Sequence, residues 1–177
     1  MKLIIGLGNP GEKYERTRHN TGVRAVRAFQ GAHADVFGEW REKFESLVSE
    51  GKIGKKKVAL LLPQTFMNDS GRAVAAAVQF WKLTPADVVV VFDDADLPLG
   101  TVRFRASGSD GGHNGLGDIL VAFGTKEVPR IKIGIGTELR GRVPLDEFVL
   151  GTFTAEEEKT LTLAIETTVT EIEKMVH

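Results

Sequence analysis

Three short apolar runs constrain the fold of this chain more than any other feature of its sequence. Residues 2–7, 58–62 and 88–92 are each dense in aliphatic and β-branched side chains. None of the three alternates between apolar and polar residues, so each predicts a strand that is buried on both faces. Strands of that kind belong to the middle of a parallel sheet, and the segments between them must cover that sheet.

Four segments have the apolar spacing of helices, and we expect them to pack on the sheet: residues 21–31, residues 71–83, a short helix that begins near Asn114, and residues 154–176. Asn20 or Thr21 is placed to cap the first helix, and Gly31 is placed to end it. Phe80 and Trp81 of the second helix are expected to be core or covering residues.

Two further strands are expected beside the apolar runs. Residues 130–136 form one, and residues 101–106 are expected to return, after a short turn, beside the strand that begins at Val88. Residues 32–52 have no clear pattern. Strands and helices thus alternate along most of the chain, which predicts an α/β fold. We expect a single domain of residues 1–177, with a twisted, mixed, largely parallel sheet and helices on both faces.

Composition and charge narrow the classes of function. The chain has no cysteine, and its four histidines are too scattered for a zinc motif, so thiol chemistry is excluded and no metal is expected. No apolar run approaches the roughly 18 residues of a membrane span, so we expect no membrane association and a cytoplasmic protein. The net charge is −1, but residues 151–177 hold two basic and six acidic residues, which leaves residues 1–150 mildly basic, at +3.

The turn after the first apolar run, GLGNPG, has the G-x-G-x-x-G spacing of dinucleotide-binding folds. That motif requires a helix that opens at the third glycine and an acidic residue about 20 positions later, after a second strand. Pro10 lies inside the turn, the residues that follow have no helical apolar stripe, and Asp35 has no strand pattern before it. A nicotinamide or nucleotide enzyme is therefore only the second interpretation.

Polar residues follow the ends of the expected strands. Asn9 and His19 come after the first apolar run, Asn68 after the second and Asp93 directly after the third, and the glycine-rich loop 111–114 follows a later strand. Ligand sites in open α/β sheets lie beyond the carboxyl ends of the strands. We therefore expect these five groups to converge on one rim of the sheet.

The chemistry that these residues allow is hydrolysis by an activated water. The chain has no G-x-S-x-G motif and no phosphate-binding G-x-x-x-x-G-K-[ST] loop. It therefore lacks the residues that usually form an acyl-enzyme or bind nucleotide phosphates in a P-loop. His19 can take a proton from water, and Asp93 can fix the imidazole tautomer and stabilise the imidazolium. Neutral asparagines can hold an amide or a carbonyl without placing a charge beside the base. His113 is equally well explained as a structural group.

Four motifs, in this order and spacing, resemble those of the bacterial peptidyl-tRNA hydrolase family: GLGNPG-x-x-Y-x-x-T-R-H-N-x-G, FMN-x-SG, D-x-x-D-LP-x-G and GGHNGL. The resemblance covers residues 2–151 and ends with the sequence FVLG. It implies a cytoplasmic, usually monomeric esterase without a cofactor, which cuts the peptide from peptidyl-tRNA and so recycles the tRNA.

The resemblance also implies roles for single residues. His19 matches the general base, Asp93 the carboxylate that supports it, and Asn9 the residue that separates blocked from unblocked aminoacyl-tRNA. We expect Asn9 to accept and donate hydrogen bonds to the amide of the blocked substrate. The positions that match contacts with the end of peptidyl-tRNA are Tyr14, Phe66, Asn68 and Asn114, and those that match contacts with tRNA phosphates are Arg105 and Lys132.

The chain departs from the family pattern in two places, neither of which affects the residues matched to the chemistry. Asp110 is acidic in a glycine-rich loop where relatives often carry histidine, and the chain ends at His177 with a short acidic tail.

An RNA-binding protein without catalysis is the third interpretation. It accounts for the basic residues, among which Arg16, Arg18 and residues 55–57 form an alternative face for tRNA. It leaves His19, Asp93 and the asparagines without a role, and the aromatic residues are too sparse for a base-stacking platform.

Overall fold

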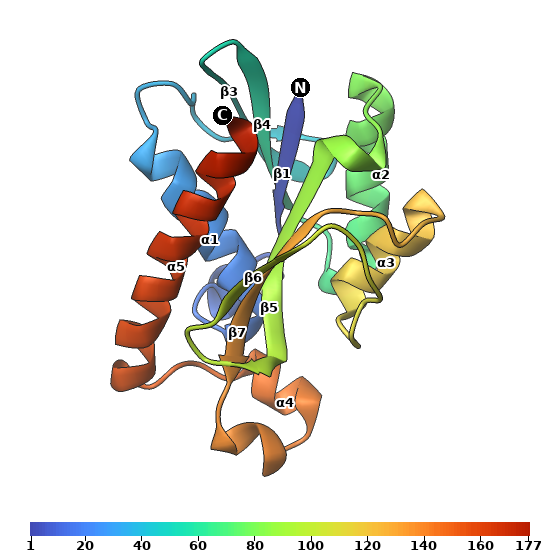
Figure 1. Cartoon of the computed structure of the whole chain (residues 1–177). Helices are drawn as coiled ribbons and strands as arrows, with labels where there is room; N and C mark the ends of the chain where they lie inside the picture. Colours follow the sequence, from blue (N-terminus) through green and yellow to red (C-terminus); the bar gives the residue numbers. More distant parts are fainter.

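The three apolar runs form adjacent parallel strands in the computed structural model, which describes residues 1–177 (Figure 1). They are β1 (Lys2–Gly6), β4 (Lys56–Pro63) and β5 (Val88–Pro98), and β1 lies between the other two. The fourth parallel strand, β7 (Arg130–Gly136), lies beside β5. Antiparallel strands complete the seven-stranded sheet at its edges: β2 (Arg41–Lys43) and β3 (Ser46–Ile53) at one, and β6 (Val102–Arg105) at the other. The predicted mixed sheet with a parallel centre is confirmed.

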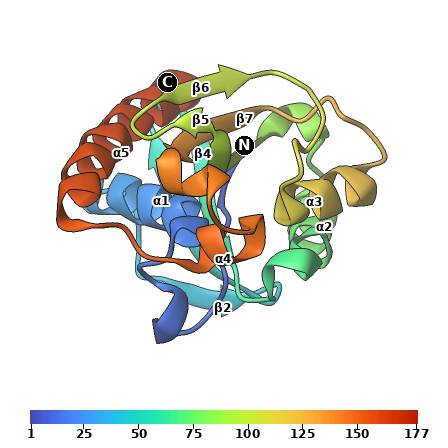
Figure 2. The same cartoon turned by 90° about the horizontal axis from the view of Figure 1, so that it is seen from below.

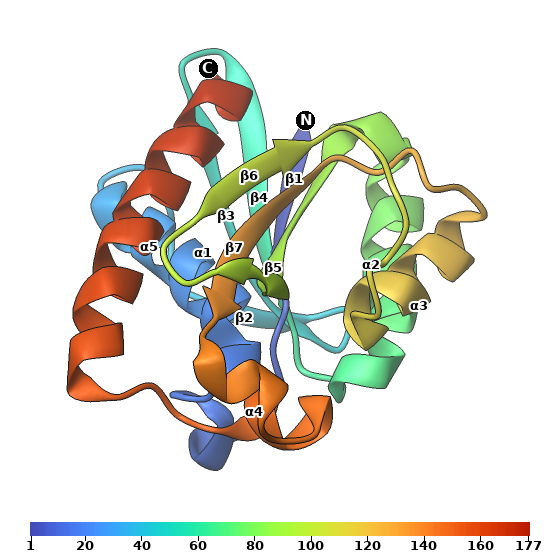
Figure 3. The same ribbon diagram turned by 60° about the horizontal axis from the view of Figure 1, so that its bottom comes forward.

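Helices cover both faces of the sheet, as the sequence predicts. On one face lie α1 (Thr21–Ala32) and α5 (Ala155–Val176), and on the other lie α2 (Ser70–Trp81) and α3 (Asn114–Phe123) (Figures 1 and 3). Each face has its own buried core, the first around Phe29 and Ile131 and the second around Leu116 and Phe92. The molecule is thus a single α/β domain of three layers.

The expected pairing of residues 101–106 with the strand at Val88 is wrong. β6 pairs antiparallel with β7, with Val102 opposite Ile133, so β7 lies between β5 and β6. The isoleucines of β7 are fully buried, whereas most side chains of β6 are exposed. The more apolar strand takes the position with neighbours on both sides, and the polar strand takes the edge.

Residues 32–52, which the sequence left unassigned, contain the β2–β3 hairpin. Phe44 and Glu45 form its turn with φ angles of 56° and 49°. This left-handed conformation is usually marked by asparagine, aspartate or glycine, none of which is present. Phe44 instead packs against Phe80 and Trp81 at the end of α2, and the Glu45 carboxylate accepts hydrogen bonds from Arg72 at 2.8 and 3.0 Å. Phe80 is 59 % exposed, so it covers the hairpin rather than filling the core.

The GLGNPG turn leads away from the sheet without opening a long helix. A short 3₁₀ helix (Glu12–Tyr14) follows it, and α1 begins only at Thr21, which removes the local geometry of a dinucleotide site. α1 then starts very close to the sheet, because a Cβ at Gly22 would meet the carbonyl oxygen of Val91 and the backbone of Leu7. This close approach places the residues just before α1 at the carboxyl ends of β1 and β5.

A short helix missing from the sequence prediction, α4 (Leu145–Leu150), lies at that same end of the sheet, between α1 and α3 in the view from below (Figure 2). The acidic tail forms α5, as expected. Thr154 is its N-cap and forms a capping box with Glu157 in the first turn. None of the helices combines the length and the apolar composition that crossing a lipid bilayer requires.

Candidate active site

A pocket of about 570 Å³ lies at the carboxyl ends of the parallel strands. The prediction that polar residues after several strands converge on one rim is confirmed. Six of the residues singled out from the sequence line this pocket: Asn9, His19, Phe66, Asn68, Asp93 and Asn114. Tyr14, Arg105 and Lys132 are not among its lining residues.

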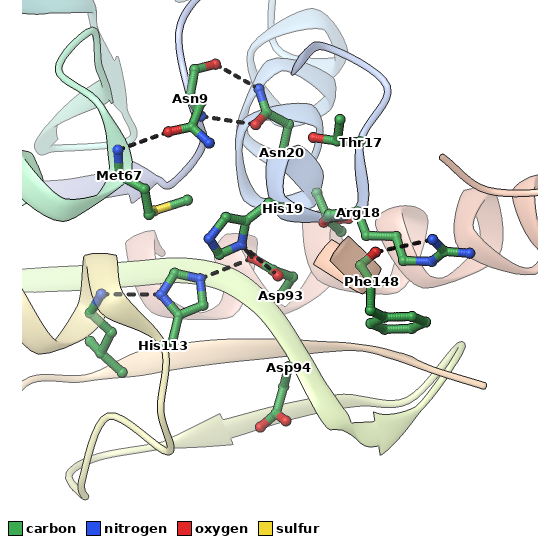
Figure 4. Close-up of polar contacts among 12 residues, drawn as sticks. Asn9, Thr17, Arg18, His19, Asn20, Met67, Asp93, Asp94, His113 and Phe148 are labelled. Atoms are coloured by element: carbon green, nitrogen blue, oxygen red, sulfur yellow. Dashed lines mark hydrogen bonds and ion pairs between the residues drawn. The ribbon is translucent and has the colours of Figure 1, made fainter. Parts of the chain in front are cut away.

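His19 and Asp93 are in direct contact at the base of the pocket (Figure 4). His19 belongs to a 3₁₀ helix (Arg18–Asn20) immediately before α1, and Asp93 is a buried residue of β5. The imidazole Nδ1 lies 2.9 Å from Oδ2 and 3.1 Å from Oδ1 of the carboxylate. Because an ionised carboxylate can only accept, Nδ1 carries the hydrogen, and Nε2 of neutral His19 is left as an unprotonated base.

His113 is the second histidine on the same carboxylate, and the sequence did not reveal this contact. Its Nε2 lies 2.9 Å from Asp93 Oδ1, while its Nδ1 accepts a hydrogen bond from the Leu116 backbone N–H at 3.2 Å. Since that backbone group can only donate, Nε2 of His113 must carry the ring hydrogen and donate to Asp93. The same bond to Leu116 makes His113 the N-cap of α3, which begins at Asn114, where the sequence predicts the start of a helix.

The two histidines set the charge of the buried carboxyl. Burial alone would raise the pKa of Asp93, but the charges and hydrogen bonds of His19 and His113 outweigh burial and hold that pKa well below its ordinary value. Burial alone would lower the pKa of His19, but the charge and hydrogen bond of Asp93 outweigh it and raise that pKa. Asp93 therefore stays ionised, and the imidazolium form of His19 is stabilised.

Asn9 is held so that only one end of its amide is free. Its Oδ1 accepts the backbone N–H of Met67 at 2.8 Å, while Asn20 bonds to both backbone polar groups of Asn9 at 2.9 Å. The remaining Nδ2 group lies on the side of His19 in Figure 4. The Met67 N–H takes one of the two acceptor positions of Oδ1, and no protein group bonds to Nδ2, so the expectation that Asn9 both accepts and donates stays a prediction, with donation the less restricted of the two.

The other predicted contact residues differ in how they are presented. Phe66 is 61 % exposed at the pocket, and Asn68 and Asn114 are also exposed. Asn68 is the middle residue of a 3₁₀ helix (Met67–Asp69), and Asn114 is the first residue of α3. Lys132 lies on β7, 3.7 Å from the carboxylate of Asp94, which lines the pocket. Arg105 is exposed at the end of the edge strand β6.

One wall of the pocket comes from a segment that the sequence analysis did not assign. α4 contributes Leu145, Asp146, Val149 and Leu150 to the lining. Asp110, the departure noted in the glycine-rich loop, accepts a hydrogen bond from the Gly112 N–H at 2.8 Å and so helps to shape that loop. Because α4 adds apolar side chains to the polar residues at the ends of the strands, the pocket is a cleft with walls of mixed polarity.

His19, Asp93 and His113 each offer an atom within 4.8 Å of the others, a spacing that could hold a metal ion. In the observed arrangement, however, both histidine nitrogens that face Asp93 carry hydrogens. A metal ion would have to displace both of these N–H groups, so the donor set fits a hydrogen-bonded triad better than a metal centre.

Residues 3–177 match the family model described as peptidyl-tRNA hydrolase. A peptidyl-tRNA hydrolase of Carboxydothermus hydrogenoformans is 50% identical over 170 residues, which are 94% of this chain and 89% of that protein, and one of Brevibacillus brevis is 48% identical over 89% of this chain and 82% of that protein. The crystal structure of a peptidyl-tRNA hydrolase from Acinetobacter baumannii superposes with a TM-score of 0.90 at 31% identity, covering 99% of this chain and 88% of the other.

We predict that the His19 imidazole titrates above its ordinary pKa of about 6.5 and that Asp93→Asn brings the pKa below that value, since burial then acts without the opposing charge. NMR titration of the imidazole Cε1–H measures this. Because the folded pKa is the higher one, the contact stabilises the protein most below pH about 6.5, and the gain is lost as pH rises through the folded pKa. Asp94→Asn, which removes a neighbouring carboxylate paired with Lys132, should leave the titration unchanged. If the His19 pKa of Asp93→Asn equalled that of the wild-type protein, Asp93 would not be the group that raises it.

Proposed function

Because the chain belongs to the peptidyl-tRNA hydrolase family, we propose that its pocket is where the ester bond between peptide and tRNA is hydrolysed, with His19 as the general base. The hydrolysis of peptidyl-tRNA itself follows from the family. The observation that carries the proposal is the 2.9 Å contact between Nδ1 of His19 and Asp93, because it leaves Nε2 free and unprotonated beside the pocket.

In this mechanism Nε2 of His19 removes a proton from a water molecule while the water oxygen attacks the ester carbonyl carbon. Ionised Asp93 stabilises the imidazolium that forms. The tetrahedral intermediate then collapses, the bond between the carbonyl carbon and the tRNA oxygen breaks, and the proton passes to that oxygen. His113, by donating to Asp93 Oδ1, keeps the carboxylate oriented toward His19.

Substrate contacts come from the rim of the pocket. The free Nδ2 of Asn9 is suited to donate to a carbonyl oxygen of the peptide, whereas it repels the ammonium group of an unblocked aminoacyl-tRNA. Asn68 and Asn114 add neutral hydrogen-bonding groups, and the exposed ring of Phe66 offers an apolar surface. Tyr14, outside the pocket lining, would contact the substrate further from the reacting ester.

We assign the contacts with the tRNA phosphates to Arg105 and Lys132. The register of β6 and β7 places Arg103 opposite Lys132 and Arg105 two residues further along, so basic side chains lie on one face of this edge. Arg18 does not contribute to the alternative basic face of Arg16, Arg18 and residues 55–57, because it is 3 % exposed and cannot reach a phosphate. We further propose that the enzyme acts as a monomer of one domain, without a cofactor, in the cytoplasm, where its substrate is made.

The decisive experiment is release of N-acetyl amino acid from N-acetylaminoacyl-tRNA in EDTA and without nucleotide. We expect the wild-type protein to release it and His19→Ala to be slower by about 10²- to 10⁴-fold, the usual contribution of a general base. His33→Ala is the matched control, since His33 bonds to Phe29 and Glu173 outside the pocket. Absence of wild-type release would refute the function, and undiminished release by His19→Ala would refute the base.

Asn9→Asp should narrow the preference for blocked over unblocked substrate. The change keeps an oxygen for the Met67 N–H but replaces the free donor by a negative charge, which attracts an α-ammonium. The ratio of kcat/KM for N-acetylaminoacyl-tRNA to that for aminoacyl-tRNA measures it. Asn68→Asp adds the same charge at the rim and should change the ratio less. If both variants changed the ratio equally, Asn9 would not be the residue that distinguishes blocked from unblocked aminoacyl-tRNA.

Arg105→Ala and Lys132→Ala should each weaken tRNA binding and lower the slope of log affinity against log salt by about 0.7 to 0.9, the contribution of one phosphate contact. Lys174→Ala removes the same charge from α5, on the opposite helical layer, and should keep the wild-type slope. Salt titrations of binding to deacylated tRNA provide the measurement. Wild-type slopes in both test variants would place the tRNA on another face.

A further inference from the structure

A buried arginine lies immediately beside the proposed base. Arg18 precedes His19 in the same 3₁₀ helix, and its side chain is only 4 % exposed. Figure 4 shows the guanidinium extending toward Phe148, on the side away from His113. The reaction described above gives this charged group no task.

The Arg18 side chain joins three consecutive parts of the C-terminal segment. One terminal nitrogen donates to the carbonyl oxygen of Phe148 in α4 at 3.1 Å, and the other lies 3.4 Å from the carboxylate of Glu157 in the first turn of α5. The guanidinium also stacks on the rings of Phe148 and Phe153, at 4.4 and 5.4 Å from their centroids. The Arg18 backbone N–H donates to the carbonyl oxygen of Gly151 at 2.9 Å.

These contacts connect the base to a wall of the pocket. Phe148 lies in the middle of α4, and its neighbours Val149 and Leu150 line the pocket together with Leu145. The residue that carries the general base and the helix that borders the substrate are therefore held by one side chain. Thr17 reinforces the link by a bridge to Thr152.

Stability alone is a poor explanation for this arrangement. A buried ion pair often contributes no more than apolar residues of the same volume would, and the Nε–H of Arg18 has no hydrogen-bond partner in the protein. Docking of α1 on α5 has its own ion pair, since Arg24 donates to both carboxylate oxygens of Glu158 at 3.0 and 2.7 Å.

We propose that Arg18 is a positioning residue, which holds α4 and the turn of His19 in one relative position so that the substrate ester and the base meet in the reactive geometry. This inference rests on the proposed role of His19. A displacement of about 1 Å between reacting groups can lower a rate by about 100-fold, so the loss of Arg18 should reduce kcat. The residues proposed to hold the tRNA backbone, Arg105 and Lys132, lie on β6 and β7 and do not contact Arg18, so KM should change little.

Arg18→Met tests the proposal, because methionine keeps much of the side-chain volume and removes both side-chain hydrogen bonds, while the backbone bond to Gly151 remains. We expect kcat for N-acetylaminoacyl-tRNA to fall about 10- to 100-fold with KM within about threefold, and Arg18→Lys to recover only part of the loss, because an ammonium lacks the planar fork that meets Phe148 and Glu157 together. Arg24→Met makes the same chemical change in α1, where Arg24 pairs with Glu158, and should keep kcat. All assays are run below the unfolding midpoint measured for each variant.

Gly151→Ala provides a second variant that leaves Arg18 chemically intact. A Cβ at Gly151 would lie 2.6 Å from Arg18 Nη1, and the backbone there has a φ of −76°, which alanine adopts readily. We expect a smaller fall in kcat in the same direction, and this variant decides the matter if Arg18→Met does not fold. Wild-type kcat in Arg18→Met or, failing that, in Gly151→Ala would overturn the proposal, as would an equal fall in Arg24→Met. An inactive wild-type enzyme would instead refute the proposed function.

Discussion

The Asp93 carboxylate, with two histidine N–H groups directed at it, is the interaction on which the arrangement of the site depends. A carboxylate buried within a central strand is stable only if its negative charge is met by donors. Here His19 comes from the start of α1 on one face of the sheet and His113 from the start of α3 on the other. β5 has helices on both faces and so receives both histidines, and the three-layer fold thereby brings two imidazoles to one carboxylate.

The centre of the fold could be predicted because it follows from local sequence. The residues of β1, β4 and β5 are too apolar for any position but the middle of the sheet, and polar residues after such strands must meet at one end. The edges could not be predicted in the same way. Whether β6 or β7 lies beside β5 depends on their competition for burial, and the Phe44–Glu45 turn is held by the contacts of Phe44 with α2 and of Glu45 with Arg72 rather than by residues that favour its backbone.

For the site, the sequence identified groups whose chemistry is general and missed those whose role comes from packing. The sequence predicts roles for Asn9, His19 and Asp93 because they follow apolar runs, whereas His113 is equally well explained as a structural group. The structure shows that His113 caps α3 and also donates to Asp93. The wall formed by α4 is a six-residue helix, too short to show a periodic pattern. Arg18 was grouped with exposed basic residues, because arginines are rarely buried unless they are paired, and the partners of Arg18 are about 130 residues away in sequence.

Whether the His19 imidazole and the Asn9 carboxamide offer a donor or an acceptor to the pocket depends on the hydrogen bond that each makes with the protein on its other side. Imidazole and carboxamide can each donate or accept, and a free side chain in water does both. Asp93 accepts the hydrogen bond of His19 Nδ1–H, which leaves Nε2 as an acceptor, and the Met67 N–H bonds to the oxygen of Asn9, which turns the amide so that Nδ2 remains as a donor. In the proposed mechanism the acceptor activates water and the donor binds a peptide carbonyl. The site therefore obtains two opposite polarities from neutral side chains, and it does so with contacts that lie on the protein side of the pocket, so that a substrate can bind without breaking them.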